Sequence, residues 1–159
     1  MIDQQKRIAL FVTCVIDQLM PEVGVDTVKV LRRAGYEVDF PAEQTCCGQP
    51  FFNSGFQDEA RRLARRTIDI LADQEIVVLP SGSCTTMIRQ EYPHLLANEP
   101  KYYYRALRLA KKTYELSEFL MKEAHWEETA VSHHPAPQPQ PITYHDSCHM
   151  CRLLGLKNE

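Results

Sequence analysis

The chain has 159 residues, of which 44% are apolar and 25% are charged, which suits a globular protein with a sizeable core. The formal net charge of −3 gives no general basic field, so we expect no nucleic-acid partner.

Strand and helix patterns alternate through the first half of the chain. Residues 8–12 are a short continuous apolar run, which is typical of a strand buried in a parallel sheet. A helix is expected from about Pro21 to Gly35, because proline is common at the first helical positions and glycine just after the end. A second strand is expected over 36–40, followed by a long amphipathic helix over 56–73.

The second half continues this alternation up to a proline-rich stretch. We expect a third strand over 75–79, a short helix over 84–92 and a long helix over 101–124. Four prolines in residues 133–141 then indicate an extended linker. A fourth strand is expected over 142–144, and a last helix begins near Arg152.

These elements predict an α/β fold, with a parallel sheet and flanking helices in a Rossmann-like three-layer arrangement. We divide the chain into a first domain over 1–126, a linker over 127–141 and the start of a second unit over 142–159. The apolar run at 8–12 is too short to span a membrane or to form a signal peptide core. We therefore expect no transmembrane segment and a cytoplasmic location.

The cysteines follow the predicted strands. A reducing cytoplasm favours metal binding or redox chemistry over structural disulfides. Cys14 follows the first strand, Cys46 and Cys47 follow the second, and Cys84 follows the third. Because the carboxyl ends of parallel strands share one edge of the sheet, we expect these four thiols to meet there.

The chemistry of four thiols restricts the cofactor. Thiolates are soft ligands that select iron–sulfur clusters, zinc or Cu(I). An adjacent Cys46-Cys47 pair suits a cluster with several irons better than one tetrahedral zinc, for which spaced cysteines are usual. Gly48 and Gly82 would let the backbone approach a bulky cofactor closely. The competing interpretation is that these cysteines are small buried hydrophobes.

Four segments carry a resemblance to a known family. They are Phe11-Val12-Thr13-Cys14, Cys46-Cys47-Gly48-Gln49-Pro50 with Asn53-Ser54-Gly55, Ser81-Gly82-Ser83-Cys84-Thr85, and Tyr144-His145-Asp146-Ser147-Cys148. Together they resemble the lactate utilization protein A family of cysteine-rich CCG-domain proteins, to which a component of heterodisulfide reductase is related. The chain would then hold one such repeat and the beginning of a second.

The resemblance implies a function that composition does not show. Cys14, Cys46, Cys47 and Cys84 would bind an iron–sulfur cluster, of the 4Fe–4S kind, with Gly48 beside it. The chain would be an electron-transfer subunit of an oxidoreductase that converts L-lactate to pyruvate with partner proteins. No catalytic residue is assigned.

The sequence departs from the family pattern at two places. The full motif ends in Cys-x-x-Cys, but Met87 occupies the last position, and a thioether is a weaker ligand than a thiolate. Cys148 resembles the first cysteine of a second repeat and is a further candidate ligand, yet no second Cys-Cys-Gly follows it. Either the chain is a fragment, or another chain completes a second site.

Two alternatives remain open at this point. The chain could be a metal-stabilised assembly module without redox catalysis, or a thiol–disulfide switch that uses Cys46-Cys47 or Cys148 and Cys151. We interpret the Cys-x-x-Cys at 148–151 as a half-built site of the second repeat. The sequence has no phosphate-binding loop and no Gly-x-Ser-x-Gly motif, so it gives no support to a nucleotide-dependent or hydrolase function.

Overall fold

The computed structural model describes residues 6–126, 141, 143 and 147–157 of the chain. Within these residues lies a four-stranded sheet in which all neighbouring strands are parallel. The strands are β1 (Arg7–Leu10), β2 (Glu37–Asp39), β3 (Val77–Leu79) and β4 (Thr113–Glu115). Their order across the sheet is β2-β1-β3-β4. The second strand of the chain therefore lies on one side of β1, and the third and fourth strands lie on the other side.

Helices connect the strands and cover both faces of the sheet. In chain order they are α1 (Cys14–Leu19), α2 (Pro21–Arg33), α3 (Gln49–Asn53), α4 (Gln57–Ile70), α5 (Gly82–Thr86), the π-helical turn η1 (Met87–Glu91), α6 (Tyr92–Leu95), α7 (Pro100–Lys111), α8 (Leu116–Lys122) and the π-helical turn η2 (His149–Leu154). No helix in the described part of the chain is long and apolar enough to cross a membrane.

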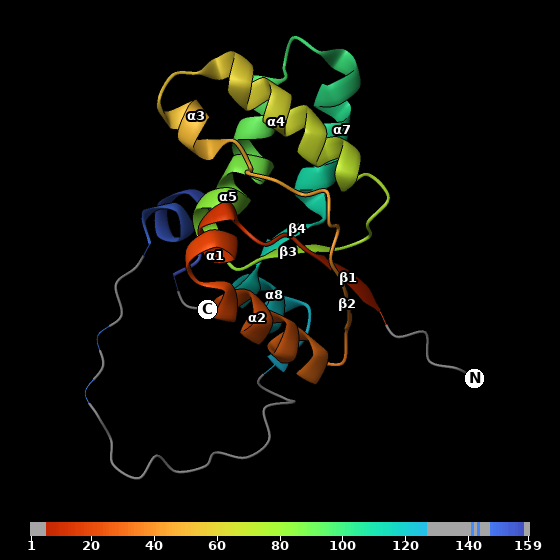
Figure 1. The fold of residues 1–159 in the computed structure, drawn as a ribbon, viewed down its shortest axis with the longest axis vertical. Helices are drawn as coiled ribbons and strands as arrows, with labels where there is room; N and C mark the ends of the chain where they lie inside the picture. The colour runs from red at the N-terminus through yellow and green to blue at the C-terminus, as the bar shows by residue number, and fades with distance from the viewer. Residues whose placement is uncertain (1–5, 127–140, 142, 144–146, 158–159) are drawn as a thin grey trace.

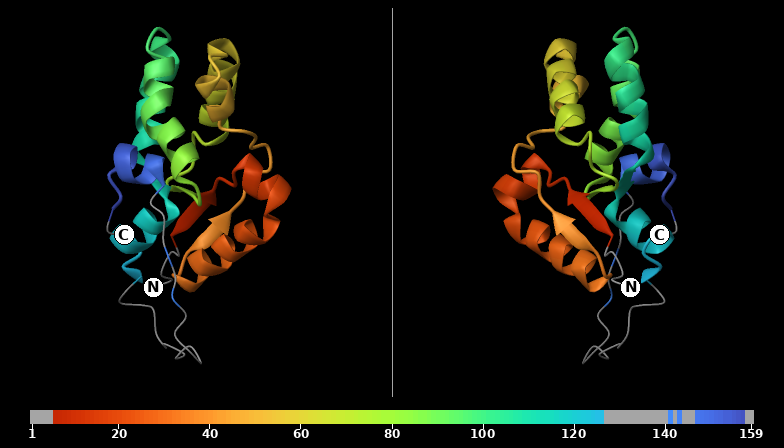
Figure 2. Two further views of the ribbon diagram at one scale, coloured as in Figure 1. Left: turned by 90° about the vertical axis from the view of Figure 1, so that its left-hand side faces the viewer. Right: turned by 90° about the vertical axis from the view of Figure 1, so that its right-hand side faces the viewer.

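The core has two halves, one on each face of the sheet. Successive side chains of a strand point to opposite faces, so Ile8 and Leu10 of β1 pack on one side and Ala9 on the other. The first half is completed mainly by α2 and α8, and the second by α4, α6, η1 and α7. Figures 1 and 2 show the sheet between these two helical layers. The predicted three-layer α/β fold is therefore confirmed.

The prediction of one long helix over 101–124 is wrong, because β4 separates α7 from α8. The α7 helix ends at Lys111, and the carbonyl of Lys112 accepts a hydrogen bond from the Val77 amide at 2.8 Å, which begins the pairing with β3. The Glu115 carboxylate then accepts a hydrogen bond from the Ser117 amide at 2.7 Å and caps α8. The β-branched Thr113 and the aromatic Tyr114 suit a strand that pairs along β3.

Other boundaries differ by smaller amounts. Two short helices, α1 and α3, were not expected, and the last helical turn begins at His149 rather than near Arg152. Residues 142 and 144 of the strand expected over 142–144, and most of the expected linker, lie outside the described residues. The division of the chain at residues 126 and 141 stays a prediction.

Candidate functional site

The four candidate thiols lie where strands of the sheet end. Cys14 is the first residue of α1, just after β1, and Cys84 lies in the first turn of α5, after β3. Cys46 and Cys47 lie in the loop between β2 and α3. Because the chain reverses its direction across the sheet between β1 and β3, the crevice beyond these two strands is the usual ligand position in such folds.

The structure brings the four sulfur atoms together in a chain of neighbours. The Sγ atoms of Cys14 and Cys46 are 3.8 Å apart, and those of Cys47 and Cys84 are 3.2 Å apart. Cys46 and Cys47 are adjacent in the sequence and so link the two pairs. The expectation that the four thiols share one edge therefore holds at the level of atomic contact.

A glutamine that the sequence analysis overlooked fixes the loop before Cys46. The Gln44 side-chain oxygen accepts a hydrogen bond from the Val12 amide at 2.7 Å, and its nitrogen donates to the Leu10 carbonyl at 3.1 Å. These are backbone groups at the end of β1. The Gln44 side chain therefore makes the hydrogen bonds that the backbone of a neighbouring strand would otherwise make. This contact holds the cysteine loop against the strand that leads to Cys14.

Gly48 and Tyr92 fix the backbone of the cysteine pair. Gly48 has a φ of 91°, a conformation that favours glycine, and its amide donates to the Cys46 sulfur at 3.4 Å. A Cβ at Gly48 would also lie 3.3 Å from the Cβ of Leu63. The hydroxyl of the fully buried Tyr92 donates to the Cys47 carbonyl at 2.7 Å.

Serines surround Cys84 at the start of α5. Ser81 is the N-cap residue, and its hydroxyl accepts a hydrogen bond from the Cys84 amide at 3.4 Å. The hydroxyls of Ser81 and Ser83 lie 3.3 Å apart. Hydrogen bonding with the Ser81 and Ser83 side chains contributes to a lowered pKa of the Cys84 thiol.

Hydrogen bonding and burial separate the proton affinities of the thiols. A hydrogen bond with the Cys47 thiol lowers the pKa of Cys46 to about 5, although burial opposes this. The same kind of bond from Cys47 lowers the pKa of Cys84. Hydrogen bonding to both neighbours, with burial, raises the pKa of Cys47, and burial is the main cause that raises the pKa of Cys14. Cys47 therefore holds its proton more strongly than its two neighbours, Cys46 and Cys84, hold theirs.

Two cavities open beside the sulfurs. One, of about 260 Å³, is lined by Cys14, Cys47 and Cys84 together with the α3 start and the Pro80–Ser83 turn. A second, of about 350 Å³, is lined by Cys14, Cys46, Gln44 and Phe40, among others. Cys47 and Cys84 are nearly buried, whereas Cys14 and Cys46 are partly exposed. A cofactor here would have a buried side and a side that a partner could reach.

The segment that contains Cys148 packs against α5, next to this site. A Cβ at Gly82 would lie 2.3 Å from the Cγ of Met150, so only glycine lets η2 approach this closely. The Gln49 side-chain nitrogen lies 3.1 Å from Nε2 of His149 and donates to the Ser83 carbonyl at 3.3 Å. Cys148 itself is exposed at the N-cap of η2.

Met87, which replaces the expected last cysteine of the motif, is fully buried. It belongs to the core half that also contains Cys47 and Cys84, and it begins the π-helical turn η1. It is not among the residues that line the two cavities beside the sulfurs. The structure thus gives Met87 a packing role.

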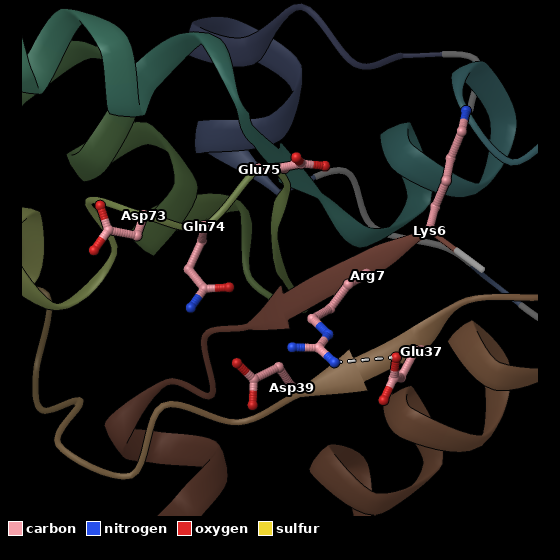
Figure 3. A pocket seen from close by; sticks show the side chains of 7 residues that line it. All are labelled: Lys6, Arg7, Glu37, Asp39, Asp73, Gln74 and Glu75. Carbon is pink, nitrogen blue, oxygen red and sulfur yellow. Dashed lines mark hydrogen bonds and ion pairs between the residues drawn. The ribbon is translucent and has the colours of Figure 1, made fainter. Parts of the chain in front are cut away.

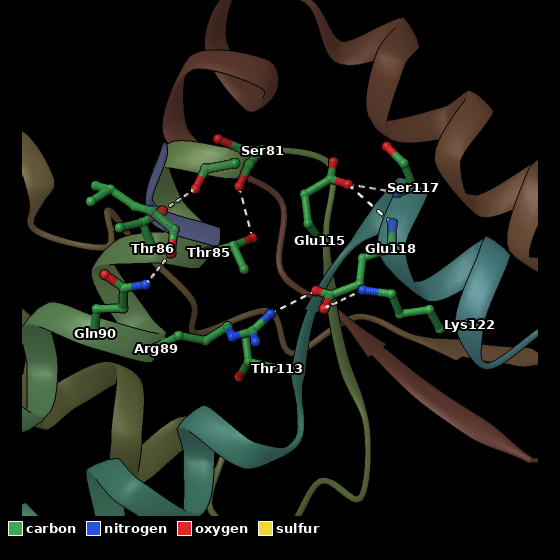
Figure 4. A network of polar contacts seen from close by, with 12 residues as sticks. Ser81, Thr85, Thr86, Arg89, Gln90, Thr113, Glu115, Ser117, Glu118 and Lys122 are labelled. Atoms are coloured by element: carbon green, nitrogen blue, oxygen red, sulfur yellow. Dashed lines mark hydrogen bonds and ion pairs between the residues drawn. The ribbon is translucent and has the colours of Figure 1, made fainter. Parts of the chain in front are cut away.

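A polar network supports the helix behind Cys84. Arg89 donates to the Glu118 carboxylate at 2.6 Å, and the Lys122 ammonium lies 3.6 Å from the same carboxylate (Figure 4). The hydroxyls of Thr85 and Thr86 donate to carbonyls one turn earlier in α5. This network ties the α5–η1 segment to α8 and so keeps Cys84 in place.

A third cavity lies elsewhere and lacks thiols. It has about 630 Å³ and opens near the amino ends of the strands, lined by Lys6, Arg7, Glu37, Asp39, Asp73, Gln74 and Glu75. Figure 3 shows Arg7 between Asp39 and Glu37, with an ion pair of 3.4 Å to Glu37. Its charges are already of both signs, and it is remote from the carboxyl ends where ligands bind in such sheets.

The four thiols fit a soft metal group by their chemistry, because thiolates are the ligands that such metals prefer. Within the described residues, the side chains as they stand do not form a ready-made group of three or more His, Cys, Asp or Glu ligands around one metal ion. The side chains would have to rotate to direct all four sulfurs at one cofactor.

Comparison with known proteins adds a family and several relatives. Residues 8–89 match the protein family described as cysteine-rich domain. The chain is 47% identical over 153 residues to lactate utilization protein A from Bacillus subtilis (strain 168), a match that covers 96% of this chain and 62% of the relative. It is 49% identical over 154 residues to the protein of the same name from Bacillus velezensis, with coverage of 96% and 62%. For that from Shouchella clausii the identity is 50% over 149 residues, with coverage of 93% and 59%. The chain thus spans less than two thirds of the length of these relatives.

Proposed function

This chain belongs to the cysteine-rich domain family, and on that premise we propose that it binds an iron–sulfur cluster through Cys14, Cys46, Cys47 and Cys84. We further propose that the cluster carries electrons in the oxidation of L-lactate to pyruvate, together with partner proteins. The observation that carries the proposal is the meeting of four thiols at the carboxyl edge of the sheet, from three separate segments that follow β1, β2 and β3.

The surroundings of the sulfurs support a thiolate-bound cluster. The Gly48 amide already donates to the Cys46 sulfur, and amides or hydroxyls near sulfur ligands tune the potential of a cluster. Bound, the group would supply one-electron transfer. The protein's part would be to hold the four sulfurs, to bury Cys47 and Cys84, and to leave Cys14 and Cys46 facing the partly open side.

Lactate as the electron donor is supported by the relatives alone. The proteins that match nearly the whole of this chain bear the name lactate utilization protein A. We assign no residue of the site as a base that takes a proton from lactate. The role that we propose for the chain is to accept and pass electrons. The substrate would be oxidised on, or with, another protein of the complex.

The test begins with anaerobic purification. We expect a brown protein that contains iron and acid-labile sulfide, and we expect both to be lost in a Cys46→Ser, Cys47→Ser double variant. A Cys148→Ser, Cys151→Ser double variant is the matched control and should keep both, because these thiols lie outside the four-sulfur site. Circular dichroism would check that each variant is folded.

A colourless parent that folds normally and takes up no iron would contradict the proposal. A parent that holds zinc in place of iron would favour the metal-stabilised assembly module instead. Loss of iron in the Cys148→Ser, Cys151→Ser variant would mean that the ligand set extends beyond the four thiols.

A further inference from the structure

The four thiols form two close pairs, and each pair joins the loop before α3 to the first turn of another helix. Cys14 approaches Cys46 with 3.8 Å between sulfurs, and Cys47 approaches Cys84 with 3.2 Å. We propose that, when no metal is bound, these pairs are oxidised reversibly to two disulfides, Cys14–Cys46 and Cys47–Cys84.

The distances leave only a small movement to be made. A disulfide bond is about 2.05 Å long, so each pair must close by roughly 1 to 2 Å. Rotation of the two cysteine side chains about χ1 moves the sulfur atoms and brings them closer. Both pairs can form together because they share no sulfur.

A disulfide between the adjacent residues Cys46 and Cys47 is disfavoured by backbone geometry. Consecutive Cα atoms lie about 3.8 Å apart across a trans peptide, whereas disulfides need about 4.4 to 6.8 Å. The described peptide bonds include no cis bond. Each of the two adjacent cysteines is therefore directed to a partner from another loop.

The oxidant class is a hydroperoxide, and the step balances with one peroxide for each disulfide. The Cys46 thiolate attacks one peroxide oxygen, the O–O bond breaks, hydroxide leaves, and Cys46 becomes a sulfenic acid. The Cys14 sulfur then attacks the Cys46 sulfur, the S–O bond breaks, and the oxygen leaves as water with the thiol proton. Two thiols lose two electrons, and these reduce the peroxide.

Hydrogen peroxide can reach both pairs of sulfur atoms, but by different routes. Cys14 and Cys46 are partly exposed, so a peroxide reaches them from solvent. Cys47 and Cys84 are buried, but both line the cavity of about 260 Å³, which is large enough to admit hydrogen peroxide. The buried pair reacts by the same two steps.

One consequence rests on the proposed function. Disulfides remove all four thiolates, so the oxidised chain cannot accept an iron–sulfur cluster until a dithiol reduces it. The same pairing protects the ligand cysteines from further, irreversible oxidation to sulfinic acid.

The test uses the metal-free chain in a Cys148→Ser, Cys151→Ser background. The protein is reduced, oxidised with hydrogen peroxide, alkylated in the unfolded state and digested with trypsin without reduction. Cys14 then lies in peptide 8–29, Cys46 and Cys47 in peptide 34–61, and Cys84 in peptide 67–89. We expect one species in which all three peptides are joined, lighter by two hydrogen atoms per disulfide.

Two single variants assign the bonds. Cys46→Ser should join 34–61 only to 67–89, and Cys47→Ser should join 34–61 only to 8–29, with the third peptide alkylated in each case. The proposal is overturned if Cys46→Ser links 34–61 to 8–29, if the parent forms a loop within 34–61 alone, or if no disulfide appears.

A second measurement separates this proposal from the proposed function. The oxidised chain is offered iron and sulfide with and without dithiothreitol, and iron is then assayed. Uptake only with the reductant supports both proposals. If the disulfides map as expected but neither sample takes iron, the cluster proposal fails and the disulfides stand. If the reduced chain takes iron but the disulfides do not form, the pairing is wrong.

Discussion

Gln44 accepts a hydrogen bond from the backbone amide of Val12 at 2.7 Å, across 32 positions of the sequence. The same side chain donates to the Leu10 carbonyl at 3.1 Å, so it satisfies two backbone groups at the end of β1. Both bonds are partly buried, and water could replace them only incompletely. The loop that carries Cys46 is thereby held beside the strand that leads to Cys14.

Replacing Gln44 by leucine tests this contact, because leucine keeps the size of the side chain but makes neither bond. We expect the free energy of unfolding to fall by about 1 to 3 kcal/mol, the usual cost of partly buried polar groups left without partners. Iron occupancy after anaerobic purification should fall as well, since Cys46 would be held less firmly. Urea denaturation and an iron assay are the measurements.

The matched control is Gln18→Leu, on an exposed glutamine of α1 whose side chain bonds to the neighbouring Asp17. Its unfolding free energy should stay within about 0.5 kcal/mol of the parent. Equal losses for both variants would show that Gln44 has no special place in the site.

The lowered pKa of Cys46 predicts selective alkylation in the reduced, metal-free protein. A thiol with a pKa of about 5 is largely thiolate at pH 6, and the thiolate is the reactive form. Cys14, whose pKa is raised mainly by burial, should be alkylated only at a clearly higher pH than Cys46. Iodoacetamide labelling from pH 5 to 9, located by tandem mass spectrometry, gives both profiles.

The two residues are suitable for direct comparison because both are partly exposed. If Cys46 and Cys14 show the same pH profile, the hydrogen bond from Cys47 does not stabilise the Cys46 thiolate. A Cys47→Ala variant probes the cause, since it removes the donor at this position and should shift the Cys46 profile toward higher pH.

The meeting of the thiols could be predicted because strand positions alone determine it. Apolar runs located β1, β2 and β3, and the rule that carboxyl ends share an edge placed Cys14, the cysteine pair and Cys84 together. Which sulfur approaches which depends on loop geometry, and no spacing rule supplies this. The contacts of Gln44 likewise join residues far apart in sequence, and a lone glutamine gives no local signal.

β4 could not be predicted because its residues are compatible with a helix. Leu109, Thr113 and Leu116 follow one another at helical spacing, so residues 101–124 resemble one amphipathic helix. Only pairing with β3 makes Thr113–Glu115 a strand, and this tertiary contact outweighs local propensity. Three-residue strands such as this one carry little periodic signal.

The contact between Gly82 and Met150 predicts how the η2 segment is held. An alanine at position 82 would place its Cβ 2.3 Å from the Met150 Cγ, so the Gly82→Ala variant should displace η2 from α5. We expect trypsin to cleave after Arg152 about fivefold faster or more, the change that ~1 kcal/mol of lost packing produces. Timed digestion followed by mass spectrometry gives the rate.

A second substitution should reverse the effect. In a Gly82→Ala, Met150→Ala double variant, the shortened side chain leaves room for the new Cβ, so cleavage should return toward the rate of the Met150→Ala single variant. If Gly82→Ala alone leaves the cleavage rate unchanged, the described packing of η2 on α5 is not what limits access to Arg152.

The ion pair of Arg89 and Glu118 predicts that replacing Arg89 destabilises the protein more than replacing Lys122, the other basic residue near Glu118. The Glu118 side chain is 9% exposed, and Arg89 lies 2.6 Å from it, while Lys122 lies 3.6 Å away and is half exposed. The Arg89→Met variant leaves the buried Glu118 carboxylate with only the more distant Lys122 as a partner. We therefore expect the free energy of unfolding to fall by about 1 to 3 kcal/mol. This is less than the roughly 3 to 5 kcal/mol typical of breaking a fully buried ion pair, because the Arg89 side chain is 30% exposed. Lys122→Met should cost about 0 to 1 kcal/mol, as exposed ion pairs do. Urea denaturation of both variants measures the difference. If Lys122→Met lowers the free energy of unfolding as much as Arg89→Met does, the ion pair of Arg89 and Glu118 does not anchor the α5–η1 segment that carries Cys84.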